Sequence, residues 1–332
     1  MAMTEAHTVE DMAADHALAG VRTQLEQIEA ALLRAAEADS PMVTEAAQHI
    51  IAAGGKRFRP LLVVLGSHIG PYAAPDDVVK AAVVVELTHV GSLYHDDVMD
   101  EAELRRGSDS ANARWGNTVA ILVGDLLFAR ASDTVAELGP EFVQLQARTF
   151  SRLVQGQIAE TVGPVDGEDP LVHYLQVVAD KTGSLIATSA LFGAKLSGAT
   201  PDEQELMAEF GAQIGVVFQL SDDIIDITSD VTGKTPGTDL REGIPTLPTL
   251  LARKSTDPND ARLLELLDSD LHHDDALAEV LELLRRHCSI GQARDEVRRR
   301  AEAARALLEP LPAGPARDAL EALCSTVVTR SA

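Results

Sequence analysis

The 332-residue sequence has few cysteines, few aromatic residues and no excess of positive charge. Only Cys288 and Cys324 occur, and their spacing does not suit a metal site, so the expected compartment is a reducing cytoplasm. Aromatic residues make up 3% of the chain, while Ala, Leu, Val and Glu dominate, which favours helices over a β-sandwich or barrel. The 52 acidic and 28 basic residues give a net charge of -24, which argues against general binding to nucleic acid or to an anionic membrane.

Long apolar runs are also missing. The best candidate for a membrane span is interrupted by Asp125, so we expect no transmembrane segment. Residues 1–16 are acidic and lack an apolar centre, so they are not expected to be a signal peptide, and residues 1–10 are expected to be disordered. Hydrophobic residues make up 45% of the chain, enough for a large core. Because there is no Ser/Gly-rich linker and no internal repeat, residues 11–332 are predicted to form one domain.

Apolar residues at 3- and 4-residue spacing predict helices along most of the chain. The first contains Leu18 to Leu32, and Ser40-Pro41 predicts a cap and first turn for a second that runs to Ala53. Further helices are predicted from Pro75 to Asp100 and over 117–137, 141–161, 168–179, 182–199 and 202–229. No alternating strand pattern is present. Residues 231–248 contain three glycines and three prolines, so they are predicted to be a mobile lid rather than a helix.

Two groups of aspartates share one spacing. They are Asp96, Asp97 and Asp100, and Asp222, Asp223 and Asp226. An α-helix advances about 100° per residue, so the first and last aspartates of each group lie on one face, one turn apart. Like charges at this spacing repel, and both groups lie in apolar sequence, so each needs a counter-charge. Proteins commonly hold Mg²⁺ with one or two carboxylates plus substrate phosphates. We therefore predict two facing carboxylate groups that bind a diphosphate through magnesium.

Basic residues lie near the first aspartate group in the sequence. Lys56, Arg57 and Arg59 form a basic turn before a helix, and Arg105-Arg106 follows Asp100 closely. Arginine forks suit the geometry of phosphate oxygens. The simpler interpretation is that these cations pair with the surplus of acidic residues, as most basic residues in this chain must.

Other motifs also have a simpler interpretation. Lys181-Thr182-Gly183 could be a turn with a cap, and Gln219 could be a satisfied core glutamine. Acidic pairs often only solvate a surface, as we expect for Asp274-Asp275. Glu86-x-x-His89 matches half of a di-iron carboxylate site, but the chain has no second such pair.

Together these motifs resemble the trans-isoprenyl diphosphate synthase (polyprenyl synthetase) family, from about Ala46 to Leu250. The motifs are Gly-Gly-Lys-Arg-x-Arg-Pro at 54–60, His-Asp-Asp-x-x-Asp at 95–100, Arg-Arg-Gly at 105–107, Lys-Thr-Gly at 181–183, Phe-Gln-Leu-x-Asp-Asp-x-x-Asp at 218–226 and Gly-Lys-x-x-Gly-x-Asp-Leu at 233–240. The resemblance implies an all-α bundle around a deep central cavity, Mg²⁺ as cofactor and a homodimer.

The resemblance also implies a role for each matching residue. Those that would hold Mg²⁺ on an allylic diphosphate are Asp96, Asp97, Asp100, Asp222 and Asp226, with Asp223 and Lys181 also among the catalytic residues. Those that would contact the same diphosphate are Arg105, Lys181, Thr182, Gln219 and Lys234. Those that would bind isopentenyl diphosphate are Lys56, Arg59, His89 and Arg106. One departure is Ile244, which stands where many members have a lysine, so one diphosphate contact is missing.

The implied reaction needs no side-chain nucleophile. Magnesium and cations would stabilise the charge that develops on the leaving diphosphate, which lowers the barrier to an allylic carbocation. A dry pocket would protect this cation from water. The double bond of isopentenyl diphosphate then attacks and a proton leaves, with the released diphosphate as the implied base.

The helix before Asp96 is expected to form one wall of the hydrocarbon channel. Each helical turn rises about 5.4 Å, close to one extended isoprene unit. The wall residues would be Gly91, Ser92, Thr88 and Val85, none of which is aromatic. Family members that stop early usually place a ring at the first two positions. We therefore predict a long-chain all-trans polyprenyl diphosphate, a precursor of a quinone side chain, with Phe128 as an alternative floor.

Three other functions stay open. One is a medium-chain farnesyl or geranylgeranyl diphosphate synthase. Another is a class I terpene cyclase, which would not need Lys56 and Arg59 for a second diphosphate. The last is a non-enzymatic subunit that regulates another synthase, against which the two intact aspartate groups argue.

Overall fold

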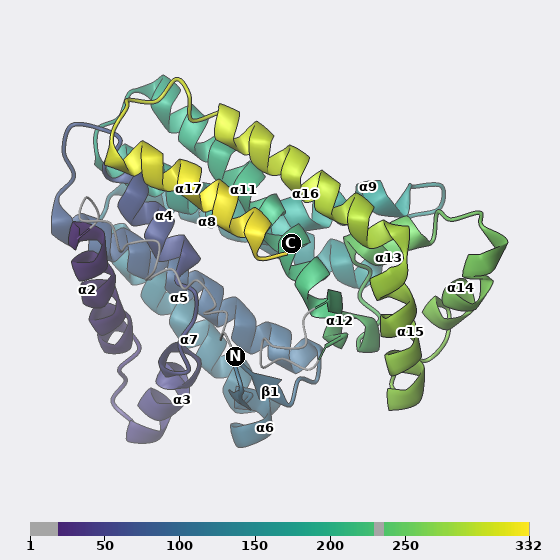
Figure 1. Cartoon of the computed structure of the whole chain (residues 1–332). Helices are drawn as coiled ribbons and strands as arrows, with labels where there is room; N and C mark the ends of the chain where they lie inside the picture. The colour runs from purple at the N-terminus through teal and green to yellow at the C-terminus, as the bar shows by residue number, and fades with distance from the viewer. Residues whose placement is uncertain (1–18, 229–235, 332) are drawn as a thin grey trace, which may run out of the picture. The chain divides into compact units, whose positions relative to one another are not determined.

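The computed structural model describes residues 19–228 and 236–331 (Figure 1). The contacts between Cα atoms group the chain into two compact units, and each is treated by itself. Unit 1 takes in the described residues up to Ser151, together with Leu185–Gly211 and Leu307–Leu323. Unit 2 takes in Arg152–Ser184, the described part of Ala212–Ala306, and the C-terminal residues from Cys324. That residues 11–332 form one domain stays a prediction.

The regular secondary structure of the described chain is almost wholly helical, which confirms the all-α prediction. The helices that begin in unit 1 are α2 (Ala19–Ala35), α3 (Pro41–Ala52), α4 (Phe58–Gly66), α5 (Pro75–Met99), α6 (Ala111–Trp115), α7 (Asn117–Ala136), α8 (Pro140–Val162), α11 (Pro201–Thr228) and α17 (Pro315–Thr329). Pro41 and Pro75 each occupy the first turn, as the sequence predicted, because a proline there gives up no intrahelical hydrogen bond.

A short hairpin in unit 1 corrects the prediction of no strands. Strand β1 (Leu104–Arg105) pairs antiparallel with β2 (Ser108–Asp109). The two residues between them, Arg106 and Gly107, both have positive φ angles, of 54° and 78°. Two left-handed residues make the tight turn that matches the twist of antiparallel strands. Strands of two residues are too short to show alternation, so periodicity could not reveal them.

Unit 2 holds most of the second half of the chain. The helices that lie entirely within unit 2 are α9 (Pro170–Val178), the π-helical turn η2 (Ala179–Gly183), α12 (Thr238–Arg241), α13 (Leu247–Ala252), the 3₁₀ turn η3 (Pro258–Asp260), α14 (Ala261–Leu267), α15 (Asp274–Arg286) and α16 (Cys288–Ala306). The helix α10 (Ser184–Leu196) follows η2 without a break. The simple turn considered for Lys181-Thr182-Gly183 is therefore wrong, because these residues lie in a π-helical turn, a form that is common at functional sites.

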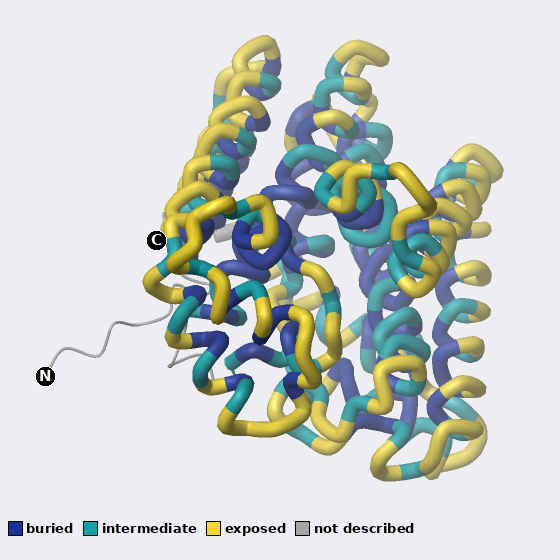
Figure 2. The backbone as a smooth tube through the Cα atoms, turned by 90° about the vertical axis from the view of Figure 1, so that its right-hand side faces the viewer, coloured by how far each residue is buried: buried dark blue, intermediate teal, exposed yellow. Residues whose placement is uncertain are grey.

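Each unit has its own apolar core. The largest fully buried side chains of unit 1 include Tyr94, Phe192, Phe210 and Leu62, and a leucine buried in this way contributes roughly 2 kcal/mol. In unit 2 the core cluster joins Ile227 of α11 to side chains of α14, α15 and α16. Figure 2 shows buried and exposed residues alternating along the helical tubes, the pattern of amphipathic helices.

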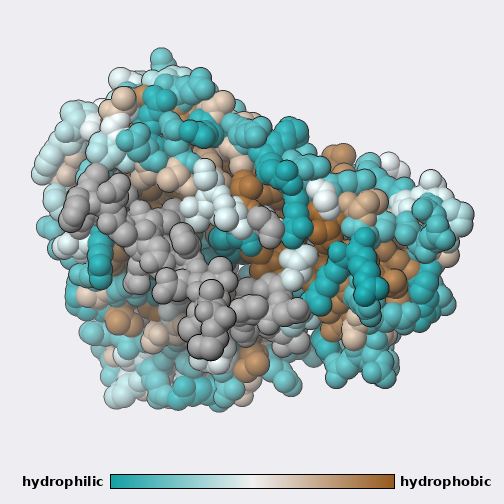
Figure 3. Space-filling view, in the orientation of Figure 1, coloured by the Kyte–Doolittle hydropathy of each residue, from teal (hydrophilic) through white to brown (hydrophobic). Residues whose placement is uncertain are grey.

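Few charged side chains of the described chain are buried; those that are belong to Glu86, Asp97 and Asp223. On the face shown in Figure 3, hydrophilic residues predominate and apolar residues lie in smaller groups between them. Within residues 19–228 and 236–331, none of the helices combines the length and the hydrophobicity that a membrane span requires. The predicted lid at 231–248 lies partly outside the described residues, and its described part contains α12 and the start of α13.

Candidate active site

The first aspartate group lies at the C-terminal end of α5. Asp96 is half-buried and Asp100, which follows the last residue of the helix, is exposed. Asp97 is fully buried, and its Oδ1 accepts a hydrogen bond from Nε of Arg105 at 2.6 Å and forms an ion pair with Nη2 of the same arginine at 2.5 Å. Burial raises the pKa of Asp97, which the Arg105 guanidinium opposes. The two outer aspartates are thus less buried than the central one, which fixes Arg105 of β1.

One oxygen of Asp97 has no partner. Its Oδ2 is buried and makes no hydrogen bond within the described residues. Leaving a buried carboxylate oxygen unsatisfied costs about 1–3 kcal/mol, so such an atom calls for an explanation, for example a bound ion. The predicted role of Asp97 as a metal ligand stays a prediction, and its hydrogen bonds give it a second role, the positioning of Arg105.

Several basic side chains of unit 1 gather around the turn before α4. Arg106 donates from Nη1 to the carbonyl oxygens of Ile50, at 2.9 Å, and Gly54, and its guanidinium lies against Gly55. The Nε of Arg59 is buried without a hydrogen-bond partner. Burial and the charge of Arg106, opposed by the carboxylate of Glu86, together lower the pKa of Arg59 to about 10. A buried cation with a free donor suits an anionic ligand.

His89 and Lys56 belong to the same part of unit 1. Burial, together with the charges of Arg59 and Arg106, holds the pKa of His89 well below its usual range, so its imidazole is neutral at pH 7. Lys56 is exposed on the turn itself. The structure thus brings together the four residues predicted to bind isopentenyl diphosphate; their role stays a prediction.

Glu86 belongs to the Glu-x-x-His pair that matches half of a di-iron site, but its partner in the structure is an arginine. Its carboxylate is buried on α5 and accepts a hydrogen bond from Nη1 of Arg57 at 2.9 Å. Arg57 also donates to both carboxylate oxygens of Glu29 on α2 and to the Ile51 carbonyl oxygen. Arg57 has a left-handed φ of 44°, so these contacts hold a strained residue that leads into α4. Because Glu86 pairs with Arg57, its carboxylate has a cationic partner other than a metal.

We expect Glu86→Gln to lower the free energy of unfolding by about 3 kcal/mol, because it removes the buried partner of a buried cation. The matched control is Glu29→Gln, which removes the other partner of Arg57. The Glu29 side chain is 41% exposed against 3% for Glu86, so water can replace it and the cost should stay below about 1 kcal/mol. Urea denaturation followed by circular dichroism measures both. Equal losses in the two variants would contradict this interpretation.

The predicted hydrocarbon wall of α5 is only partly open to a ligand. A Cβ atom at Gly91 would lie 3.0 Å from Phe128 Cε1 and 3.2 Å from the Gly124 carbonyl oxygen, so Gly91 lies where α5 meets α7. Phe128 in turn packs on Phe150, with ring centroids 4.5 Å apart. Of the four predicted positions, Ser92 is the only half-buried one; the others are buried.

A hydrogen bond joins this wall to α8 at Thr88, one helical turn before Ser92 in the sequence. Gln146 of α8 donates from Nε2 to the Thr88 hydroxyl at 3.2 Å, and the same face of α8 carries Thr149, whose hydroxyl bonds that of Thr188 at 2.5 Å. All four side chains are buried. A row of hydroxyls and an amide in an apolar interior is costly unless paired, and here each residue has a partner.

The second aspartate group lies in unit 2, near the C-terminal end of α11. Asp223 is buried and accepts hydrogen bonds from the Tyr174 hydroxyl, from Gln219 Nε2 at 3.1 Å and from the Leu247 amide at 3.2 Å. Burial nevertheless raises the pKa of Asp223 to about 6. Asp223 therefore ties α9 and α13 to α11.

The outer aspartates of this group are half-buried and contact charged or polar partners. Asp222 Oδ1 accepts a hydrogen bond from Nη2 of Arg330 at 2.5 Å. The carboxylate of Asp226 accepts from the amides of Thr238 and Asp239, each at 3.3 Å, at the start of α12. A carboxylate at this position compensates the unpaired amides of a helix N-terminus.

The π-helical turn contains two further predicted residues, Lys181 and Thr182, and Thr182 is linked to the second aspartate group through Gln219 of α11. Thr182 donates to Oε1 of Gln219 at 3.3 Å, and Gln219 in turn donates to Asp223. Lys181 forms an ion pair with Glu160 of α8. Lys234, the remaining predicted diphosphate contact in this part of the chain, lies outside the described residues.

The donor sets fit a hard divalent cation that is shared with a substrate. Each group offers carboxylate oxygens on one helix face, and neither supplies a complete protein cage. Magnesium keeps several waters and is bound by one or two carboxylates plus phosphate oxygens, so an incomplete cage is what it needs. When bound, Mg²⁺ would neutralise charge on a leaving diphosphate.

Sequence reasoning missed several residues that organise the site. Tyr174 and Arg330 contact the second aspartate group from 49 and 108 residues away along the chain. Neither forms part of a local motif, so only the three-dimensional structure could find them.

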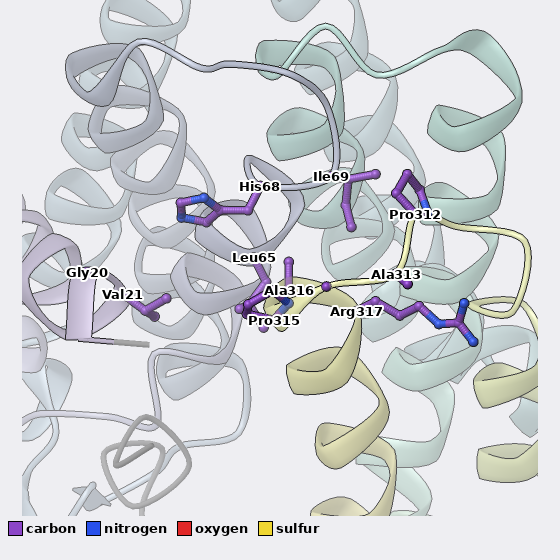
Figure 4. Close-up of a pocket in the computed structure, with 11 residues that line it drawn as sticks. Gly20, Val21, Leu65, His68, Ile69, Pro312, Ala313, Pro315, Ala316 and Arg317 are labelled. Carbon is purple, nitrogen blue, oxygen red and sulfur yellow. The ribbon is translucent and has the colours of Figure 1, made fainter. Parts of the chain in front are cut away.

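A separate pocket of about 320 Å³ lies in unit 1 (Figure 4). It is bordered by the start of α2, the end of α4 and the segment before α17. Its two polar side chains are those of His68 and Arg317, and none of the predicted site residues lines it.

Comparison with known proteins agrees with this geometry. The sequence model of the polyprenyl synthetase family matches residues 40–284. A nonaprenyl diphosphate synthase of Mycobacterium tuberculosis is 46% identical over 314 residues, which cover 94% of this chain and 92% of that protein. The structure of geranylgeranyl pyrophosphate synthase from Corynebacterium glutamicum, complexed with calcium and isoprenyl diphosphate, has a TM-score of 0.84 at 44% identity and covers 96% of this chain and 98% of that one.

A second solved structure shares the fold over its full length. The polyprenyl synthase from Caulobacter crescentus, also complexed with calcium and isoprenyl diphosphate, has a TM-score of 0.89 at 30% identity and covers 99% of this chain and 100% of that one. The matched part of the chain contains every predicted site residue. The chain therefore belongs to the polyprenyl synthetase family, as its motifs predicted.

Proposed function

We propose that this family member is a Mg²⁺-dependent prenyltransferase that repeatedly condenses an allylic diphosphate with isopentenyl diphosphate. The observation that carries the proposal is the basic cluster of unit 1, in which Arg59, His89 and Arg106 lie together and Arg106 directly follows Arg105, the partner of Asp97. A terpene cyclase has one diphosphate to bind, so it would not need this cluster.

Different residues of the chain would bind the two diphosphates. Arg59 and Arg106 would hold the diphosphate of isopentenyl diphosphate, since their forks match phosphate oxygens. Neutral His89 could donate a hydrogen bond to it without adding charge. Arg105, fixed by Asp97, would contact the leaving diphosphate. Cations placed in advance where negative charge develops are a large source of rate enhancement.

We propose a long-chain product, destined for a quinone side chain. The small side chains at Ser92 and Thr88 support it, as does the name of the relative from Mycobacterium tuberculosis, a nonaprenyl diphosphate synthase. A medium-chain product is the second candidate. The Gln146–Thr88 hydrogen bond favours a medium-chain product, because it joins α8 to the wall helix about two turns before Asp96 and would limit the depth of the channel there. The 44% identity to the geranylgeranyl pyrophosphate synthase from Corynebacterium glutamicum also favours it.

Incubation of the purified chain with farnesyl diphosphate and isopentenyl diphosphate, in Mg²⁺ or in EDTA, tests the proposal. Chromatography of the dephosphorylated products should show extended prenyl alcohols in Mg²⁺ and none in EDTA. A cyclic hydrocarbon formed without isopentenyl diphosphate would identify a terpene cyclase. No product under any condition would favour a regulatory subunit.

We also propose a cytoplasmic homodimer. Both cysteines are free, which fits a reducing compartment. In unit 1, α7 exposes Ile121 and Leu122; in unit 2, α8 exposes Ile158 and Val162. Exposed apolar side chains grouped on helices commonly mark a protein–protein interface.

We expect Leu122→Glu to raise the dimer dissociation constant at least tenfold, because a buried carboxylate would have no partner. The control is Tyr72→Glu, since Tyr72 is 71% exposed against 60% for Leu122 but lies outside α7 and α8. Light scattering after size-exclusion chromatography, over a range of protein concentrations, measures the change. A dimer equally stable in both variants would place the interface elsewhere.

A further inference from the structure

The C-terminal end of the chain contacts the second aspartate group. Arg330 Nη2 lies 2.5 Å from Asp222 Oδ1, and both side chains are partly buried, at 21% and 29% exposure. The guanidinium also lies over the ring of Phe218, 5.0 Å from its centroid. Phe218 and Asp222 are four residues apart on α11, so they present one face of the helix to Arg330.

Two hydrogen bonds hold this end of the chain in place. The Ser221 hydroxyl donates to the Val327 carbonyl oxygen at 3.0 Å, which fastens the last turn of α17 to α11. Arg294 of α16 donates from Nε to the Ser331 carbonyl oxygen at 2.7 Å, immediately after Arg330. These two hydrogen bonds lie on either side of Arg330 in the chain, so the ion pair forms in an ordered part of the C-terminal segment rather than in a frayed terminus.

The pair has a direct consequence for metal binding. A guanidinium and a divalent cation that approach the same carboxylate oxygen repel each other, because both are positive. A metal that takes Asp222 Oδ1 therefore competes with Arg330 for this oxygen and favours displacement of the guanidinium. The Phe218 ring would keep the displaced guanidinium nearby through its cation–π contact, where its fork could meet phosphate oxygens.

We propose that Arg330 is the counter-cation of Asp222 and competes with the divalent metal for this carboxylate. Arg330 is a positioning residue. Its positive charge offsets that of Asp222 while the metal is absent, and the metal displaces the guanidinium when the metal binds. The inference rests on the proposed function only in taking Asp222 as a metal ligand.

Binding of Mn²⁺ to the full chain without substrate, followed by electron paramagnetic resonance of the free ion, tests the proposal. Arg330→Gln should tighten Mn²⁺ binding about threefold, the size expected for removal of a partly exposed ion pair. Arg330→Lys keeps the charge and should bind Mn²⁺ within a factor of two of the wild type. Thermal unfolding of each variant confirms that it is folded.

A matched control separates this pair from the general charge of the protein. Arg298→Gln removes the same charge from an exposed pair with Asp295, and it should leave the Mn²⁺ affinity unchanged. If Arg330→Gln and Arg298→Gln behave alike, the proposal is overturned.

Asp222→Ala distinguishes the two ways in which the account could fail. Loss of a Mn²⁺ site in this variant, with no change in Arg330→Gln, would reject the role of Arg330 and leave the metal site intact. Retention of every Mn²⁺ site in Asp222→Ala would reject Asp222 as a ligand, and with it both this inference and that part of the proposed function.

Discussion

Asp96→Asn should lower the rate of chain elongation about 10³-fold, or roughly 4 kcal/mol of transition-state stabilisation. Asp96 lies in the last turn of α5, half-buried, with the basic cluster of unit 1 nearby. The amide keeps the shape of the side chain and loses the charge that would attract a metal. Incorporation of radiolabelled isopentenyl diphosphate at saturating Mg²⁺ measures the rate.

Two controls make the result specific. Asp275→Asn removes one charge from an exposed turn of α15 and should leave the rate unchanged. Asp97→Asn removes the buried charge next to Asp96, so it should act mainly through Arg105 and raise the KM for the allylic diphosphate. If Asp96→Asn stayed within tenfold of the wild type, the aspartate group of α5 would not be the metal site.

Ser92→Phe should shorten the product by several isoprene units while the enzyme remains active. Ser92 lies four residues before Asp96, about 6 Å along the same helix face, so a ring there would block the channel close to the reacting diphosphate. Its hydroxyl donates within its own helix, to the His89 carbonyl oxygen at 2.8 Å, so the substitution breaks no side-chain hydrogen bond between helices among the described residues. Chromatography of the dephosphorylated products measures their length.

The structure shows why Ser92 is the better of the two candidate positions. Gly91→Phe would drive a ring into Phe128 and into the backbone of α7, so a change of product could reflect misfolding. Ser92→Ala is the matched control, since it removes the same hydroxyl without adding a ring, and it should leave product length unchanged. A product of wild-type length from Ser92→Phe would mean that this face of α5 does not measure the chain.

The sequence predicted the helices well because their signals are local. Pro41 and Pro75 mark helix starts by removing a hydrogen-bond donor that the first turn does not use. The π-helical turn at Lys181 escaped prediction because one wider turn barely changes the spacing of apolar residues. The β1–β2 hairpin escaped because four paired residues form no pattern.

The site was predictable in its residue types and less so in its pairings. The aspartate spacing identified which carboxylates share a helix face, but it could not show that Asp97 and Asp223 turn into the protein to hold Arg105 and Tyr174. Nor could it show which cation each acid takes, because ion pairs such as Arg57–Glu86 join distant parts of the chain. That the two aspartate groups face one shared cavity stays a prediction, as each belongs to its own unit.

The central claim is that these aspartates hold a diphosphate through a divalent metal. Equilibrium binding of an unreactive farnesyl thiodiphosphate, with Mg²⁺ and with EDTA, tests it most directly. We predict at least a hundredfold tighter binding in Mg²⁺, with most of that gain lost in Asp96→Asn and in Asp222→Ala. Equal affinity in Mg²⁺ and in EDTA would contradict the account, because the diphosphate would then be held by the cationic side chains alone.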